Sequence, residues 1–283
     1  MTTRRFRVLL ALAIALVTNS AAAQDKGSPA KSKPKATAWA FAMTPVMAER
    51  LRSADEAQIR AALDEIRVAG KAAAAAAPIV AEILQRGLTL SLSEAALDTL
   101  GDVESEAAAP VLAMYAAHRN LTLRRAAVKA LIHTRGAAAE KALRRALADA
   151  DPMVRGVAAT GLGTMRAHDA VGDLFSALDH TVVEAAASIG QLCTPEQCDQ
   201  LAGKLGRLPF DVVTSGLDQI LFRPQTEVTD DAKIKLVGRV RELGTNEAHK
   251  FLTDVQSRWP KVGSPRVKQS IDQGVLATAG GSQ

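Results

Sequence analysis

The amino-acid sequence repeats itself at a spacing of about 31 residues. Seven positions recur in three successive copies, and most of them hold Ala, Leu or Val. In the middle copy these positions are Arg124, Ala127, Val128, Leu131, Ala139, Leu143 and Leu147. In the next copy they are Arg155, Ala158, Ala159, Leu162, Ala170, Leu174 and Leu178, and in the preceding copy Ser93, Ala96, Leu97, Leu100, Ala108, Leu112 and Ala116. A fixed period of this length is typical of stacked supersecondary units that bury their apolar faces against one another.

Each repeat is expected to contain two helices. In the middle copy, residues 122–133 and 138–148 both place apolar side chains on one face at helical spacing, and Gly136 separates them. The next copy opens with Asp151 and Pro152, a helix-capping residue followed by the residue that suits the first helical position. The sequence therefore predicts an all-α fold, an α-solenoid made of stacked antiparallel helix pairs.

The period is regular over residues 48–208 and degrades over 209–280. One unit before the strict copies and one after them fit with adjusted spacing, and the later unit has a shorter first helix. Pro78 and Pro110 are placed in the first turn of second helices, because proline breaks a helix interior. In the degenerate part, amphipathic helices are expected at residues 210–222, 232–243, 246–259 and 265–278.

The composition indicates which side chains form the core. Hydrophobic residues make up 48% of the chain, but only two Trp, one Tyr and six Phe are present. The core must therefore consist of Ala and Leu, which suits closely approaching helices and does not suit a β-sandwich.

The run Asp151-Pro152-x-Val154-Arg155, followed by Ala158-Ala159 and Leu162-Gly163, resembles the HEAT-repeat family in its short, phycobiliprotein-lyase-type form. The resemblance implies an armadillo-like helical superhelix and, for function, mostly protein–protein interaction. HEAT-repeat di-iron hydroxylases share this architecture but use His-Glu dipeptides. No His in this sequence precedes a Glu.

The N-terminus has the three parts of a signal peptide. Arg4, Arg5 and Arg7 precede an uncharged apolar stretch at residues 8–17, and small residues lead to an expected cleavage after Ala23. Ten apolar residues are too few for a stable membrane span, which needs about 20. Residues 1–23 are therefore predicted to be a signal peptide, with an uncleaved anchor as the alternative. The mature protein would be periplasmic or secreted, and no later segment is expected to span a membrane.

Residues 24–37 are predicted to be a disordered basic linker, with the solenoid occupying residues 38–283. The linker carries four Lys against one Asp and no apolar anchor. The full chain has a charge of +5, but the linker and the three leader arginines contribute three charges each, which leaves −1 for the rest. A domain so close to neutral lacks the basic surface that nucleic-acid binding requires. The linker acts either as a solubilising spacer or as a weak contact with an anionic envelope surface.

Cys193 and Cys198 are the only cysteines and flank a short turn between helices. An exported protein meets oxidising conditions, and a turn of this length can bring the two β-carbons within disulfide distance. The sequence favours a structural disulfide over a free pair of thiols. A zinc site is the weakest alternative because no third or fourth ligand lies nearby.

No motif identifies a catalytic, cofactor-binding or metal site. His180 and Glu184 have the spacing of two ligands on one helix face, but a single such pair is usually a chance surface arrangement. Arg155 invites interpretation as an anion-binding residue. The repeat offers a structural role instead, since Arg124 occupies the equivalent position and either side chain can bond to Asp or carbonyl groups between units.

The second helices are expected to line the concave face, where solenoids usually bind. The candidate partner-binding residues on that face are Lys141, Arg144, Arg145, Asp173, Lys204 and Arg207. Their mixed signs favour a protein surface as ligand. The sequence thus predicts a non-enzymatic, exported scaffold that binds a protein of the cell envelope and needs no cofactor. The alternatives are a HEAT-like lyase or cofactor-handling protein, and a structural module without a tight partner.

Overall fold

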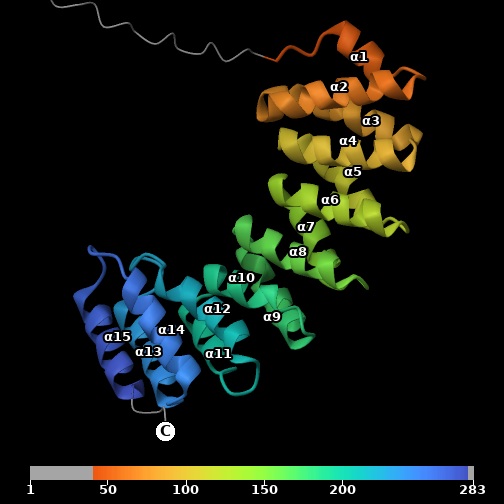
Figure 1. Ribbon diagram of the computed structural model, residues 1–283. Helices are drawn as coiled ribbons and strands as arrows, with labels where there is room; N and C mark the ends of the chain where they lie inside the picture. Colours follow the sequence, from red (N-terminus) through yellow and green to blue (C-terminus); the bar gives the residue numbers. More distant parts are fainter. Residues whose placement is uncertain (1–40, 280–283) are drawn as a thin grey trace, which may run out of the picture. The chain divides into compact units, whose positions relative to one another are not determined.

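The computed structural model describes residues 41–279, in which helices joined by loops and turns are the only regular structure apart from one isolated β-bridge between Leu205 and Leu208 (Figure 1). The predicted signal peptide (1–23) and linker (24–37) lie outside the described residues. The all-α prediction is confirmed. The helices are α1 (Pro45–Leu51), α2 (Glu56–Ala69), α3 (Ala77–Arg86), α4 (Leu90–Val103), α5 (Ala109–Tyr115), α6 (Leu121–His133), α7 (Ala137–Ala146), α8 (Pro152–Thr164), α9 (Val171–Asp179), α10 (Glu184–Leu192), α11 (Pro195–Ala202), α12 (Phe210–Leu221), α13 (Asp230–Glu242), α14 (Asn246–Arg258) and α15 (Pro265–Thr278).

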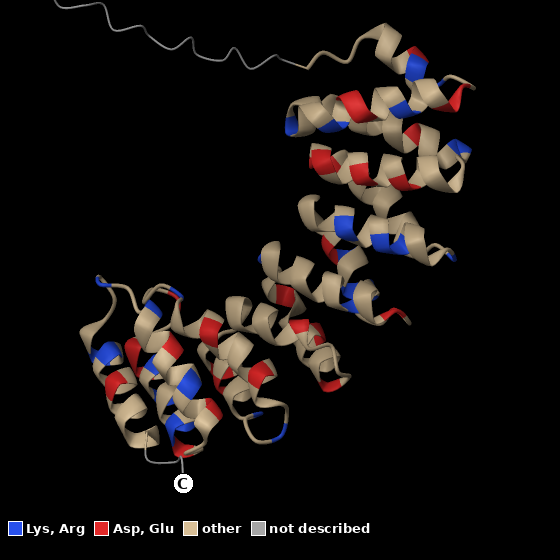
Figure 2. Ribbon diagram, in the orientation of Figure 1, with Lys and Arg blue, Asp and Glu red and all other residues tan. Residues whose placement is uncertain are grey.

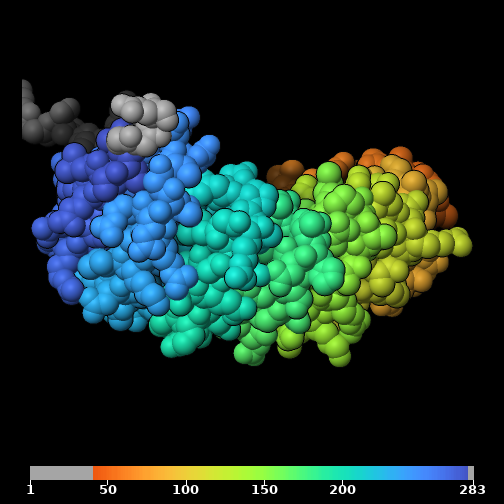
Figure 3. Space-filling model, turned by 90° about the horizontal axis from the view of Figure 1, so that it is seen from below, coloured from red at the N-terminus to blue at the C-terminus, as the bar shows by residue number. Residues whose placement is uncertain are grey.

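Helix pairs stack in sequence order from α2–α3 to α10–α11, one pair for each repeat unit. The first helices α2, α4, α6, α8, α10 and α12 each contact the next in series. Second helices such as α5, α7 and α9 pack against the first helix of the following unit. The space-filling view shows the same order, because each stretch of sequence lies beside the next (Figure 3). The fold is therefore the α-solenoid that the 31-residue period predicts.

Local sequence signals set the helix boundaries. Pro78 and Pro110 occupy the first turns of α3 and α5, as expected. Asp151 caps α8, with its side chain accepting a hydrogen bond from the backbone N–H of Val154, and Pro152 follows at the first position. The shortened unit is also confirmed, since α10 has 9 residues where α8 has 13.

The core consists of Ala and the branched aliphatic residues, as the composition predicts. The largest fully buried side chains are Leu and Ile, among them Leu97, Leu131 and Leu162. Alanines at the repeat positions, such as Ala127 and Ala158, are completely buried between them. Small side chains at these positions let neighbouring helices approach closely.

One stretch has the length and apolar composition of a membrane span, contrary to the expectation that no segment would. It covers Glu56–Arg86 and comprises α2, a 3₁₀ segment (Gly70–Ala76) and α3. The chain is kinked inside it, where Gly70 has φ +54° and Ala73 is non-helical. Both α2 and α3 pack against α4, and their apolar residues form part of the solenoid core. A third of the apolar window in this stretch is buried, so part of its apolar composition serves the solenoid core.

The arginines of the repeat tie neighbouring segments together. Nε and Nη2 of Arg124 in α6 donate to the Asp149 carboxylate at 2.9 and 3.2 Å, in the loop before α8. Arg155 donates to the backbone carbonyls of Asp149 and Ala150 at 2.9 and 3.1 Å. Arg125 bonds to both carboxylate oxygens of Asp151 at 3.0 and 2.7 Å. The structural role predicted for the repeat arginines is confirmed.

The stability of the protein should fall in acid partly through Asp151. Hydrogen bonds from Arg125 and, secondarily, from the N–H of Val154 hold the pKa of Asp151 below its usual value. Since the folded-state pKa is depressed, this stabilisation is complete above the unfolded-state pKa of about 3.9 and is lost as pH falls through the folded value. Asp151→Asn keeps a capping acceptor but cannot titrate. We expect the urea midpoint of this variant, measured by circular dichroism, to change less between pH 5 and pH 3 than the midpoint of the wild type. Equal pH dependence of the two midpoints would contradict the prediction.

The degenerate C-terminal part packs differently from the regular units. The predicted helices are present with bounds within two residues of expectation, and α15 has both its predicted ends. Helix α13 packs mainly against α15, and α14 also packs against α15, whereas α12 contacts both α13 and α14 only slightly. The difference lies between α12 and α13, where the row of first helices is interrupted; α13, α14 and α15 then repeat the contact pattern of the regular units.

Candidate functional site: a groove between α7 and α9

Helices α7 and α9 carry the polar residues that line the candidate site. Gly136, at φ +106°, begins α7 in a conformation that residues with a side chain rarely adopt. Helix α7 buries Ala139, Ala142, Leu143 and Ala146 against the core, which leaves its charged residues on the opposite face. Helix α9 likewise buries Val171, Leu174, Phe175, Ala177 and Leu178. The helical period therefore turns both polar faces outward.

A groove of about 1090 Å³ lies between these two second helices. Small residues leave it unfilled, chiefly Ala137 and Ala148 on the α7 side and Ser176 and Ala177 on the α9 side. Its full lining is Ala137, Glu140, Lys141, Arg144, Arg145, Leu147, Ala148, Asp149, Arg155, Asp169, Asp173, Ser176, Ala177 and His180. Charges of both signs are interspersed on the helices along the stack (Figure 2).

The groove contains both paired and unpaired charges. Arg144 on α7 and Asp173 on α9 form an ion pair of 2.5 Å that joins the two walls, with Glu140 3.8 Å from Arg144. Asp149 is engaged by Arg124. Within residues 41–279, no carboxylate lies at ion-pair distance from Lys141 or Arg145, and no cation lies at that distance from Asp169.

Four of the six predicted partner-binding residues lie together here: Lys141, Arg144, Arg145 and Asp173. The prediction concerned a concave surface, whereas the structure shows a groove between neighbouring second helices. Lys204 lies at the next gap, 2.5 Å from Asp179 and with Nζ 6.0 Å from the centre of the Phe175 ring. Arg207 is exposed in the turn after α11 and does not line the groove. Whether any of the six contacts a partner stays a prediction.

Sequence reasoning did not include four charged residues of the groove among the partner-binding candidates: Glu140, Asp149, Arg155 and Asp169. Asp169 lies in a 3₁₀ turn (His168–Ala170) before α9, so a search along helix faces did not include it. Arg155 was assigned only to the repeat framework, yet its side chain also reaches the groove. Asp169 could have been found from the sequence because it precedes Asp173 by four residues, about one helical turn.

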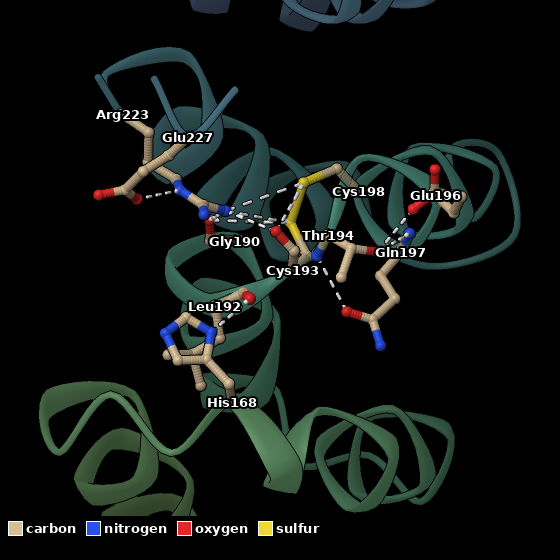
Figure 4. The surroundings of a disulfide bond; sticks show 10 residues. All are labelled: His168, Gly190, Leu192, Cys193, Thr194, Glu196, Gln197, Cys198, Arg223 and Glu227. Carbon is tan, nitrogen blue, oxygen red and sulfur yellow. Dashed lines mark hydrogen bonds and ion pairs between the residues drawn. A yellow bond between two sulfur atoms is a disulfide. The ribbon is translucent and has the colours of Figure 1, made fainter. Parts of the chain in front are cut away.

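The predicted disulfide is present. Cys193 and Cys198 are bonded, with their Cα atoms 5.3 Å apart, and both are almost fully buried. Cys193 ends α10, and Cys198 lies in α11 behind a capping box formed by Thr194 and Gln197. The Arg223 guanidinium points at both sulfurs, with Nη1 3.7 Å from Cys193 Sγ and 4.0 Å from Cys198 Sγ (Figure 4).

Arg223 also links this turn to the loop after α12. Its Nη1 donates to the carbonyl of Cys193 at 2.8 Å, and its Nε donates to Glu227 at 3.0 Å. The buried Lys233 donates to the carbonyl of Arg223. The disulfide turn is therefore part of the contact between the last regular unit and the degenerate part.

His180 and Glu184 do not share a helix face. His180 ends α9, with Nδ1 2.8 Å from the carbonyl of Ser176, while Glu184 begins α10. In the part of the chain that the structure describes, no group of three His, Cys, Asp or Glu side chains is arranged to hold a metal ion. The absence of an enzymatic activity stays a prediction.

The geometry defines a class of protein, the all-α solenoids of HEAT and armadillo type. Residues 115–190 match the family model described as HEAT repeats, so this part of the chain, from the end of α5 to α10, consists of HEAT repeats. HEAT repeats generally mediate protein binding. The search of curated proteins returned no match for the chain.

Solved structures are similar in fold at low sequence identity. A homology model of the full-length AP-3 complex in an intermediate open conformation is 12% identical, with a TM-score of 0.50, over 84% of this chain and 50% of that chain. The CpcE–CpcF complex of phycocyanin lyase from Nostoc sp. PCC7120 is 17% identical, with a TM-score of 0.44, over 89% of this chain and all of that chain. The designed armadillo repeat protein YIII(Dq)4CqI is 16% identical, with a TM-score of 0.40, over 83% and 99%. At these identities the similarity concerns the fold alone.

Proposed function

We propose that this protein is an exported, non-enzymatic HEAT-repeat scaffold that binds another protein of the cell envelope. The α7–α9 groove carries the proposal, because it combines an apolar floor of small residues with a rim of charges, two of them unpaired cations. Protein-binding surfaces combine apolar centres with polar rims in this way. The HEAT match over residues 115–190 includes both helices of the groove.

Export rests on the N-terminal sequence pattern and agrees with the disulfide. Structural disulfides persist in oxidising compartments and are rare in the cytosol. Intact-mass measurement after expression of the full chain tests this part directly. A mature protein that begins at Gln24 supports export with cleavage after Ala23, and a chain that retains residues 1–23 contradicts that cleavage.

Affinity capture from envelope extracts tests the binding role. The variant Arg144→Glu/Arg145→Glu reverses two charges of the groove, and Arg119→Glu/Arg241→Glu makes the same change in net charge elsewhere. Arg119 and Arg241 are both exposed, lie outside the groove and are not among the six predicted partner-binding residues. We expect one reproducible protein that the wild type and the control retain and the groove variant loses. Equal recovery by both variants would place binding elsewhere.

The alternative of a lyase or cofactor-handling protein makes a different prediction. Such a protein would carry a stoichiometric chromophore or metal after purification. An absorbance spectrum and elemental analysis of the exported protein decide between the two. A bound chromophore or metal at one equivalent would overturn the scaffold proposal.

A further inference from the structure

We propose that the α7–α9 groove binds an acidic helix, one whose two carboxylates lie a single turn apart and pair with Lys141 and Arg145. This inference names the chemistry of the partner and rests on the proposed binding function. Lys141 and Arg145 are four residues apart on α7, so their side chains project from the same face as neighbours. Both are exposed, and both line the groove.

The charges of the groove leave these two cations uncompensated. Glu140 and Asp173 both lie beside Arg144, and Asp149 pairs with Arg124. The Arg155 guanidinium donates to two backbone carbonyls and, within residues 41–279, has no carboxylate at ion-pair distance, so its positive charge is also unpaired. The α7 wall is therefore positive where the groove opens, and a ligand with two carboxylates complements it.

The next two second helices are joined by a side chain that has no counterpart in the α7–α9 groove. Between α9 and the turn after α11, the Lys204 ammonium pairs with Asp179 and lies near the Phe175 ring. Apart from histidine, the uncharged residues that line the α7–α9 groove are Leu147 and small Ala and Ser residues, so a partner would supply the charges that pair with Lys141 and Arg145.

The dimensions suit a short helix. An α-helix with its side chains is about 10–12 Å across, so about 1090 Å³ accommodates roughly two to three turns. The lining includes the small residues Ala137, Ala148 and Ala177, which let a helix approach closely. The exposed Asp169 stands at the start of α9, on the opposite wall, and a basic residue on the partner would pair with it.

Charge disfavours two other occupants. The segment 24–37 of this chain carries four Lys against one Asp, the same sign as the α7 wall. A second copy in a two-fold contact would add its own Lys141 and Arg145 to the same interface, because such an interface uses one patch on both subunits.

Fluorescence anisotropy with labelled helical peptides tests the proposal. The probes are three 14-residue peptides of Ala, Leu and Gln that carry Glu, Gln or Lys at two positions four residues apart. The protein is the one purified after export of the full chain. We expect the Glu peptide to bind roughly three- to tenfold more tightly than the Gln peptide in low salt, and the ratio to shrink as salt is added.

Charge reversal provides the decisive comparison. Lys141→Glu/Arg145→Glu leaves the Arg144–Asp173 pair intact and should prefer the Lys peptide, whereas Arg119→Glu/Arg241→Glu should still prefer the Glu peptide. Circular dichroism verifies that each variant is folded. Equal affinities of the Glu and Gln peptides for the wild type would overturn the proposal, as would loss of discrimination in the control.

The competing occupants have their own outcomes. Deletion of residues 24–37 that strengthens binding of every peptide would show that the linker occupies the groove. A dimer in sedimentation that the Lys141→Glu/Arg145→Glu variant abolishes would show that a second copy does. Either result overturns the acidic-helix proposal. If the groove captures an envelope protein but the Glu and Gln peptides bind equally well, this inference alone is refuted. If affinity capture recovers no partner at all, the proposed function is refuted.

Discussion

Replacement of Gly190 by Ala should destabilise the protein by about 2–3 kcal/mol, although Ala is the better helix former. Gly190 lies inside α10 where this helix crosses α12. A methyl group there would overlap the backbone of Gly216, meeting its carbonyl oxygen and lying 2.9 Å from its Cα. Backbone atoms cannot rotate away as a side chain can, so the two helices would have to separate.

Gly238→Ala is the matched control, since it makes the same substitution inside helix α13. No atom lies within 4 Å of the position that its methyl group would take. We expect this variant to gain roughly 0.5–1 kcal/mol from helix propensity alone. Urea unfolding followed by circular dichroism gives both values. If Gly190→Ala is also stabilising, the close approach of α10 and α12 is not a feature of the native protein.

The prediction for Gly190 shows where sequence reasoning reached its limit. The position after the Leu of the repeat holds Gly101, Gly163 and Gly190 in different units. The sequence suggested a helix end near Gly163, and α8 does end one residue later, at Thr164. The reason for a small residue is different, because methyl groups at these three positions would meet Ala130, Ser188 and Gly216 of the next first helix.

Local signals were sufficient for the architecture. The apolar period, Pro78, Pro110 and the Asp151-Pro152 cap act within one or two turns of helix, so the sequence displays them directly. The interruption of the row between α12 and α13 depends on which side chains meet across the loop of residues 222–229. Degenerate repeats carry no fixed register from which to infer such contacts.

The candidate site was predictable in part for the same reason. The helical period predicted Lys141, Arg144 and Arg145 as polar positions of a second helix, and in the structure all three are exposed on α7 and line the groove. Whether a space remains beside them depends on the size of residues on the next helix. Ser176 and Ala177 leave the α7–α9 groove open, whereas Lys204 extends toward Phe175 at the following gap.

Reduction of the Cys193–Cys198 disulfide should cost about 2 kcal/mol of unfolding free energy. The bridge closes a loop with a sequence separation of only 5, so it restricts the unfolded chain less than a long-range bridge would. Unfolding in urea with and without a reductant measures the difference in unfolding free energy without substituting either cysteine. A Cys193→Ala/Cys198→Ala variant should show no response to the reductant. Equal midpoints for the oxidised and reduced wild type would contradict the prediction.

The loss of stability on reduction should be concentrated in the fifth unit, which consists of α10 and α11, and in the loop after α12. Each repeat of a solenoid contacts mainly its neighbours, so weakening one unit does not spread evenly along the stack. Arg223 holds the carbonyl of Cys193 and lies against both sulfurs, and Glu227 and Lys233 hold Arg223 in turn. Amide hydrogen exchange should therefore accelerate on reduction in the α10–α11 turn and in residues 223–229. Exchange in α2, α4 and α6 should be unchanged, and uniform acceleration along the chain would show that the bridge acts on the whole solenoid.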